Sequence, residues 1–217
     1  MLLDLELDLS EDLMAARDQG CRPTCLAFAA SDAHAHARGY PKVALSPEYA
    51  FFHAAQRMGV LSSGQGVTMT AMLGTLEMEG QPEEQHFPYA SHPPAPSLPL
   101  PPSPFPHPIY KRVADPQSPK VDQVIDSLRA SQTVIVILDI TQQFDRATGN
   151  PALVDVVPGD RIRGRHAVVA VGLACNRQGV AYIKIRNSWG LGWGHEGYAW
   201  LSLSYLKQQI VTTARFQ

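Results

Sequence analysis

The hydrophobic pattern of the chain is helical in the first half and strand-like in the second half. Alanine-rich or amphipathic runs follow the start signals at Pro23-Thr24 and at Ser46-Pro47, and such runs predict helices. We expect the first helix to begin at Cys25, with Thr24 as its cap. The predicted helices cover roughly residues 25–38, 47–58, 69–80 and 121–131.

Apolar runs of strand length dominate the second half, after an extended lead-in at the start of the chain. Turn residues such as those at 176–179 predict a reversal between two neighbouring strands. The predicted strands cover residues 133–140, 166–175, 181–187 and 197–203. We therefore expect an α+β protein of one domain, residues 1–217, in which a helical lobe (about 20–110) meets an antiparallel β lobe (about 111–217).

A proline-rich segment lies between these two halves. Residues 91–108 hold nine of the 18 prolines, a content that excludes a helix or an inner strand and predicts polyproline II structure. Three interpretations stay open. The segment is a solvated loop between the lobes, a docking ligand for a partner with an SH3-type groove, or a strap over the protein's own surface.

The composition and charge exclude several classes of partner. The chain has 217 residues, 45% of them hydrophobic, and a net charge of -2, which predicts neither nucleic acid nor an anionic membrane as a partner. The N-terminal run alternates leucine with acidic residues, unlike a signal peptide, and no segment reaches the roughly 20 apolar residues of a membrane-spanning helix. We expect a cytoplasmic protein, or one exported into a target cell without a classical signal peptide.

Three cysteines are too few to predict a disulfide scaffold, so we expect reduced thiols. Cys175 ends an apolar strand and is expected to be a small buried residue. His34 and His36 point to different faces of a predicted helix, and Cys21 with Cys25 lacks a second pair of ligands. Neither a metal nor a cofactor is therefore expected.

Cys25 is the candidate nucleophile. A catalytic cysteine acts as a thiolate, and a helix N-terminus and a neighbouring histidine both lower the pKa of its thiol. A cysteine at a helix start is by itself more often a small buried residue. However, His166 stands at the mouth of a buried strand, about 140 residues further on, within the roughly 130–150 residues typical of a cysteine–histidine catalytic pair.

Four ordered segments carry a more specific signal. They are Gln19-Gly20 with Cys25 and Ala27-Phe28; Phe87-Pro88-Tyr89; His166-Ala167-Val168 with Val171-Gly172; and Asn187-Ser188-Trp189-Gly190 with Gly192-Trp193-Gly194 and Gly197-Tyr198. Together they resemble the papain-like cysteine peptidase family, from about residue 14 to the C-terminus. The resemblance implies a helical left lobe, an antiparallel, β-barrel-like right lobe and an active-site cleft between them.

The same resemblance implies a cysteine endopeptidase that works through an acyl-enzyme. Cys25 would attack the scissile carbonyl, and His166 would pair with the thiolate and then protonate the leaving amine. Asn187 would orient the imidazole, and Trp189 would shield that hydrogen bond from water. The Gln19 amide and the Cys25 backbone N–H would form the oxyanion hole.

Substrate-binding positions follow from the resemblance as well. Gly66 matches the loop glycine that pairs with the substrate backbone, and Trp193 would form the floor of the leaving-group side. Met69 and Ile137 are expected to line an apolar side-chain pocket. Arg165, directly before the predicted base, would either weaken the ion pair or select acidic groups of the substrate.

Departures from the family pattern indicate an unusual, prokaryotic-type member. Arg22 stands where the family usually has a cysteine bridged to the glycine-rich loop, and Leu26 replaces the usual tryptophan. We also expect no inhibitory propeptide before the lead-in. One hypothesis is therefore a specialised effector or toxin protease that is restrained by a cognate inhibitor or immunity protein.

Two alternatives keep the fold and change the function. An amidase, a deamidase or a transglutaminase-like enzyme would use the same triad for another acyl transfer. A non-catalytic protein-binding module would use the fold, with the proline-rich segment 91–108, only for docking. The expected partner in every case is a protein or a peptide.

Overall fold

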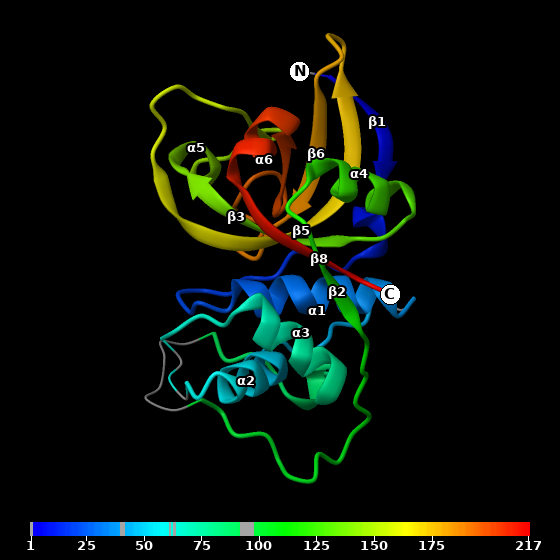
Figure 1. The fold of residues 1–217 in the computed structure, drawn as a ribbon, viewed down its shortest axis with the longest axis vertical. Helices are drawn as coiled ribbons and strands as arrows, with labels where there is room; N and C mark the ends of the chain where they lie inside the picture. Colours follow the sequence, from blue (N-terminus) through cyan, green and yellow to red (C-terminus); the bar gives the residue numbers. More distant parts are fainter. Residues whose placement is uncertain (1, 40–41, 61, 63, 92–97) are drawn as a thin grey trace.

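A helical part and a curved sheet lie at opposite ends of the molecule (Figure 1). The computed structural model describes residues 2–39, 42–60, 62, 64–91 and 98–217. The helical part consists of α1 (Cys25–Ala37), α2 (Pro47–Arg57), α3 (Met69–Met78) and the short turn η2 (Glu84–His86). The three helices predicted for this part are confirmed. Within the described ranges, no helix is both long and apolar enough to cross a bilayer.

The two capping signals behave differently. Ser46 caps α2, because its Oγ accepts a hydrogen bond from the backbone N–H of Tyr49 at 3.0 Å, and Pro47 occupies the first turn. Thr24 stands at the cap position of α1, but its side chain makes no capping bond. Its hydroxyl instead bonds to the Tyr89 hydroxyl at 2.8 Å, so the predicted cap is wrong.

The sheet occupies the other end of the molecule, and its strands are nearly all antiparallel. The strands are β1 (Leu3–Asp8), β2 (Ala114–Gln117), β3 (Val134–Thr141), β4 (Leu153–Val154), β5 (Ile162–Asn176), β6 (Ala181–Arg186), β7 (Tyr198–Ser202) and β8 (Ile210–Phe216). Their order is β2-β8-β3-β5-β6-β7-β4, with β1 beside β5, and among the strands of the described residues only the β4–β7 pair is parallel. The expected α+β class is confirmed.

Short helical segments connect or precede these strands. They are η1 (Ser10–Asp12), α4 (Val121–Arg129), α5 (Gln142–Asp145) and α6 (Leu203–Gln209). Only α4 was predicted from its repeating apolar positions. Helices of one or two turns carry too few residues for such a repeat, which explains why α5 and α6 were missed.

Both ends of the chain take part in the sheet. The lead-in, predicted only as extended, forms β1, in which Leu3 lies opposite Asn176 and Asp8 opposite Gly172 of β5. β8 lies between β2 and β3, although no strand was predicted there. A strand's partner is distant in sequence, so local patterning does not reveal it.

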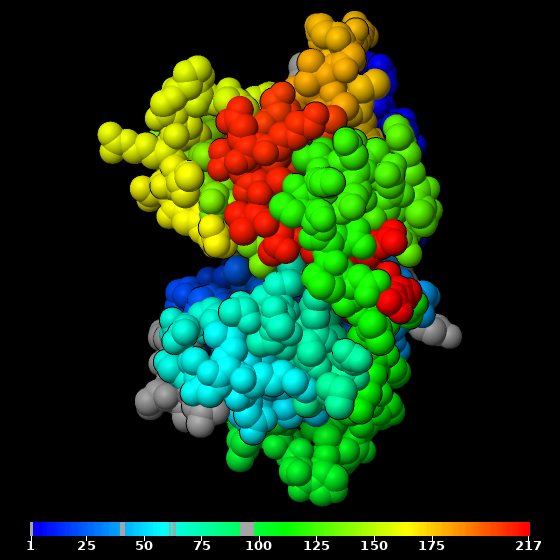
Figure 2. Space-filling view, in the orientation of Figure 1, coloured from blue at the N-terminus to red at the C-terminus, as the bar shows by residue number. Residues whose placement is uncertain are grey.

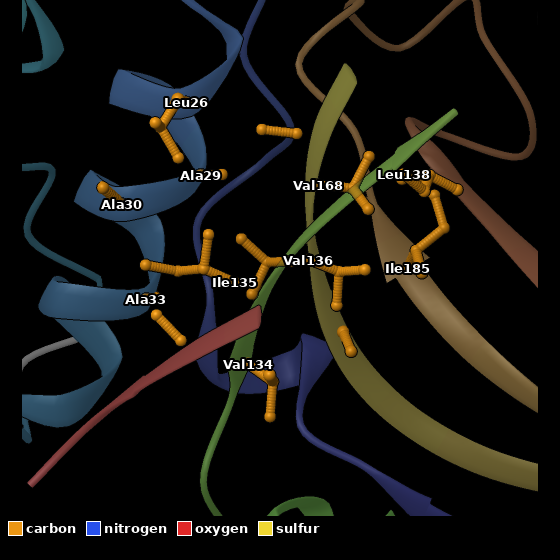
Figure 3. Close-up of a cluster of buried hydrophobic side chains, with 14 of the residues drawn as sticks. Leu26, Ala29, Ala30, Ala33, Val134, Ile135, Val136, Leu138, Val168 and Ile185 are labelled. Atoms are coloured by element: carbon orange, nitrogen blue, oxygen red, sulfur yellow. The ribbon is translucent and has the colours of Figure 1, made fainter. Parts of the chain in front are cut away.

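The shared core fixes α1 against the sheet. Figure 3 shows Ala30 and Ala33 of α1 beside Ile135 of β3, with Val168 of β5 and Ile185 of β6 deeper in the same cluster. These side chains are at most 1% exposed. Because alanine is small, the helix approaches the strands closely, and the start of α1 is held in a defined position beneath β5.

The described part of the proline-rich segment lies against the protein itself. Leu98 is buried, and the ring of Phe105 packs at 5.1 Å from that of Tyr49 on α2. This arrangement agrees with the strap interpretation for residues 98–108. Residues 92–97 lie outside the described residues, and docking of a partner by this segment stays a prediction.

Candidate active site

Cys25 is the first residue of α1, and it lies beneath the strand that carries His166. Its side chain is half-buried, and the backbone N–H of Ala167, the residue after His166, interacts with its sulfur. Figure 2 shows the surface hollowed between the two parts, where the blue N-terminal chain comes into view. The sequence-predicted nucleophile and base are therefore brought to the same seam between helices and sheet.

His166 and Asn187 are joined by a short side-chain hydrogen bond. His166 Nε2 lies 2.6 Å from Asn187 Oδ1, and both side chains are buried. The backbone N–H of Ser188 also donates to that Oδ1, at 2.8 Å, which identifies it as the amide oxygen. His166 Nε2 therefore carries the proton, and Nδ1 is left as the basic nitrogen.

Three aromatic rings cover this hydrogen bond. The Trp189 ring lies 4.6 Å from the His166 ring, and the Phe144 ring lies 6.1 Å from it. Trp193 packs on both other rings and donates its indole N–H to the carbonyl oxygen of Phe144 at 3.1 Å. Excluding water strengthens the bond between His166 and Asn187, because competing hydrogen bonds are absent.

Burial favours the neutral forms of both reactive groups. It raises the pKa of the Cys25 thiol, although the backbone N–H groups of Ala167, Leu26 and Cys25 act in the opposite direction. This overturns the lowered thiol pKa expected from the sequence. Burial also lowers the pKa of His166 to about 4, against the effect of its bond to Asn187. Transfer of a proton from the Cys25 thiol to the His166 imidazole creates a thiolate and an imidazolium at the same time. The attraction between these two charges offsets the cost of burying each of them.

Gln19 is held on three sides near the nucleophile. Its Nε2 donates to the carbonyl oxygen of Arg22 at 2.8 Å, and its Oε1 accepts from Ser188 Oγ at 2.7 Å. Its backbone carbonyl accepts from the Tyr89 hydroxyl at 2.7 Å. An amide nitrogen has two hydrogens, so one N–H of Gln19 remains for another acceptor.

A half-buried carboxylate links the segments that carry Gln19 and Asn187 to the helix of Cys25. Asp32 of α1 accepts from Arg17 at 2.6 Å through Oδ1 and from Arg186 at 2.6 Å through Oδ2. Burial raises the pKa of Asp32, but the two guanidinium groups outweigh it and hold that pKa below its ordinary value. Arg17 stands two residues before Gln19, and Arg186 directly precedes Asn187.

Arg22 is anchored in the interior three residues before Cys25. Its guanidinium forms two bonds to the Glu48 carboxylate, at 2.5 and 2.8 Å, and one to the carbonyl oxygen of Ala90 at 2.8 Å. The rings of Phe51 and Tyr89 lie within 5.5 Å of the same group. Since Arg22 also accepts the Gln19 amide bond, this ion pair stabilises the loop that leads to the nucleophile.

The predicted substrate-binding residues lie around this centre at different depths. Gly66 is exposed, and a methyl group added to it would meet the carbonyl oxygen of Pro23 at 3.5 Å, beside the nucleophile loop. Met69 is buried and Ile137 half-buried, both packed in the common core. Arg165 is exposed and pairs with Asp139 at 2.9 Å.

The remaining cysteine and histidine candidates from the sequence lie outside the predicted site. Cys175 is exposed, so its expected burial is wrong: the side chain projects from the solvent-facing side of β5. His34 is buried and its Nδ1 bonds to Gln81 at 3.0 Å, whereas His36 is half-buried. No grouping of three or more histidine, cysteine or acidic residues suited to a metal occurs among the residues that the structure describes.

Three contributors to the site were missed or only partly recognised. Ser188 and Tyr89 both hold Gln19, and both occur in segments whose family resemblance was noted without giving them a role. Phe144, beneath Trp193, has no local signal, because it belongs to a single helical turn in an unpredicted element. Its position depends on how α5 packs on the sheet.

Comparison with known proteins agrees with this geometry. The papain family cysteine protease model matches residues 6–215. Xylellain, a cysteine protease from Xylella fastidiosa, superimposes with a TM-score of 0.77 at 20% identity, covering 100% of this chain and 87% of that protein. The Carica candamarcensis cysteine protease CMS1MS2, solved with E-64, gives 0.73 at 18% identity, with 97% of both chains covered.

A curated relative matches a shorter stretch. A cysteine protease of Blomia tropicalis is 35% identical over 80 residues, which are 37% of this chain. The matched stretch is only 23% of the length of that relative. The solved structures establish the fold, and the family match, which runs over residues 6–215, establishes the membership: the chain belongs to the papain family of cysteine proteases.

Proposed function

We propose that the protein is a cysteine endopeptidase that cuts peptide bonds through an acyl-enzyme on Cys25. The observation that carries the proposal is the buried bond of 2.6 Å between His166 Nε2 and Asn187 Oδ1, next to the strand position that contacts the Cys25 sulfur. It directs the basic Nδ1 of the imidazole away from Asn187. A histidine oriented in this way is the base that activates a thiol.

The reaction follows from these positions. The Cys25 thiol gives its proton to His166, and the sulfur attacks the scissile carbonyl carbon. The free N–H of Gln19 and the backbone N–H of Cys25 stabilise the oxyanion. The imidazolium then protonates the leaving amine, and a water molecule, deprotonated by the same imidazole, hydrolyses the thioester.

Six residues are assigned to substrate binding, and one of them, Trp189, also covers the bond between His166 and Asn187. Gly66 would pair with the substrate backbone, since its exposed position beside the nucleophile loop leaves its peptide groups accessible. Met69 and Ile137 would line an apolar pocket, and Trp193 would support the leaving-group side. Arg165 would act only weakly on substrate charge, because Asp139 already pairs with it.

A proteome cleavage profile tests the proposal. Wild-type protein is expected to generate new peptide termini in a cell lysate, and Cys25→Ala is expected to generate none. An epoxide inhibitor of the E-64 type should label Cys25 much faster than the exposed Cys175. Equal labelling rates, or products that differ only by the mass change of deamidation, would contradict an endopeptidase.

The biological setting is a further part of the proposal. We place the enzyme in the cytoplasm, or in a target cell after export, as an effector or toxin with a cognate inhibitor. The support is the free state of Cys21, Cys25 and Cys175, which suits a reducing compartment. Rapid degradation of casein together with harmless expression in the producing cell would argue against a restrained, narrow enzyme.

A further inference from the structure

A positively charged pocket lies beside the candidate active site. It has a volume of about 330 Å³ and is lined by Gln142, Asp145, Arg146, Arg161 and Arg163. Three guanidinium groups therefore face one carboxylate, in a chain whose overall charge is -2. We call this set of residues the arginine pocket. It concentrates positive charge in a protein whose net charge is negative.

The guanidinium groups of the arginine pocket retain free hydrogen-bonding capacity. Arg163 bonds to Asp145 through Nε at 3.3 Å, and its side chain is 62% exposed. Arg146 donates to the amide oxygen of Gln142 at 2.6 and 3.0 Å when that amide is oriented to satisfy its neighbours. Arg161 forms no salt bridge with any acidic residue in the part of the chain that the structure describes.

The pocket shares its supporting elements with the active site. One side of the single turn α5 carries Phe144, whose ring lies 5.0 Å from that of Trp193 and 6.1 Å from that of His166. Gln142 and Asp145 of α5 line the pocket. Figure 1 shows α5 and the beginning of β5 on the same side of the molecule.

The pocket is within reach of a bound peptide. Arg163 precedes His166 by three residues on β5, a separation of about 10 Å at about 3.3 Å per strand residue. An extended substrate therefore needs about three residues beyond the scissile bond to span that length. Because Phe144 supports Trp193, the pocket lies on the leaving-group side.

We propose that the arginine pocket binds a carboxylate of the substrate on the leaving-group side of the scissile bond. The proposal rests on the proposed peptidase function and names one feature of its substrate. Planar guanidinium groups bind carboxylates through paired hydrogen bonds, and Arg161 with Arg163 offers two such groups against one internal acid. The carboxylate belongs either to a glutamate or aspartate side chain or to the C-terminus of a short peptide.

Quenched fluorescent peptides based on a sequence cut in the proteome profile test the proposal. Each of the first four positions after the cut carries glutamate or glutamine in turn, and each glutamine peptide is made with a free and with an amidated C-terminus. We expect about tenfold higher kcat/KM for glutamate at one position, or for a free C-terminus, and a smaller ratio at high salt. A higher kcat/KM for glutamate at one position identifies a side-chain carboxylate as the ligand, and a higher kcat/KM for the free C-terminus identifies a terminal carboxylate.

The double variant R161Q/R163Q is expected to bring that ratio to about one while it leaves cleavage of the amidated glutamine peptide unchanged. R177Q, which alters an exposed arginine in the β5–β6 turn, should keep the wild-type ratio. A ratio near one in wild type, or one that the double variant leaves unchanged, would overturn the proposal.

A separate binding measurement distinguishes failure of the proposed peptidase function from failure of the arginine pocket. If wild type cuts no peptide at all, that function is wrong, and fluorescence anisotropy of a labelled triglutamate peptide still tests the arginine pocket. Wild type should bind it more tightly than triglutamine, and R161Q/R163Q should lose the difference. Equal binding of triglutamate by wild type and the double variant would refute the pocket on its own.

Discussion

The guanidinium group of Arg22 and the carboxylate of Glu48 form a two-point ion pair in the interior of the helical part, with side chains 2% and 0% exposed. Arg22 occupies the position where papain-like relatives usually have a bridged cysteine, and Cys21 and Cys25 beside it are free thiols. The loop before the nucleophile is therefore held by charge and hydrogen bonds instead of a covalent bridge.

Breaking this pair is expected to be costly. Glu48→Gln leaves a buried guanidinium without its counter-charge, a change that destabilises proteins by about 3–5 kcal/mol. The matched control is Glu79→Gln in the more exposed Arg57–Glu79 pair, where the loss should be below about 1 kcal/mol. Urea unfolding measures both values. Comparable losses in the two variants would show that Arg22–Glu48 does not anchor the loop.

Asp32→Asn is expected to lower both stability and kcat. Arg17 and Arg186 each lose a charged partner, so the segments leading to Gln19 and Asn187 are held less firmly against α1. Turnover, measured where circular dichroism shows the variant folded, should fall while KM changes little. A stability loss with unchanged kcat would mean that Asp32 supports the fold without positioning the site.

Gln19→Ala removes the side-chain donor that we propose for the oxyanion hole. One such donor contributes about 100- to 1000-fold in kcat, so we expect a loss in that range with little effect on KM. Ser188→Ala keeps the donor and removes only the bond that holds its Oε1, so its loss should be smaller. Steady-state kinetics give both values. A larger effect of Ser188→Ala would reverse the two roles.

Asn187→Ala frees the imidazole of His166 to rotate. A hydrogen bond to a charged group is worth about 1.5–3 kcal/mol, which corresponds to a fall of about 10- to 100-fold in kcat. Gln178→Ala, at an exposed turn position, is the control and should retain full activity. Unchanged kcat in Asn187→Ala would remove the basis for the triad.

His34 is expected to make stability pH-dependent. Burial lowers its pKa to about 4, so the unfolded chain, with a pKa near 6.5, binds a proton on His34 that the folded chain does not. The stabilisation is complete above pH 6.5 and is lost as the pH falls towards 4, by about 2 kcal/mol at pH 5.

His34→Gln should therefore lose less stability than wild type between pH 7.5 and 5 in urea unfolding. His166 has a similarly lowered pKa and remains in the variant, so about half of the effect of these two histidines should disappear. His195→Gln, at an exposed position, should behave like wild type. An unchanged slope in His34→Gln would show that the buried imidazole is not the cause.

The ordered motifs were sufficient to identify Cys25, His166, Asn187 and Gln19 as one candidate site, because each residue type is tied to a local pattern at a helix start or a strand end. The helices were predictable for a similar reason, since caps and apolar repeats are local. Local patterning failed at the Thr24 cap and at Cys175. The Thr24 hydroxyl could bond to a backbone N–H or to Tyr89, and the Cys175 side chain could face the core or the solvent. In both cases the tertiary packing around the residue decides the outcome.

The sequence by itself determined the α+β class and the main helices and strands, and it predicted the chemistry proposed for Cys25. Only the tertiary structure decided that Asp32 joins Arg17 to Arg186, that Glu48 faces Arg22, and that β1 closes on β5. Each of these contacts joins residues distant in sequence. Their pairing depends on burial, because burial brings charges together where water no longer screens their attraction. No local sequence pattern specifies which distant residues will meet in this way.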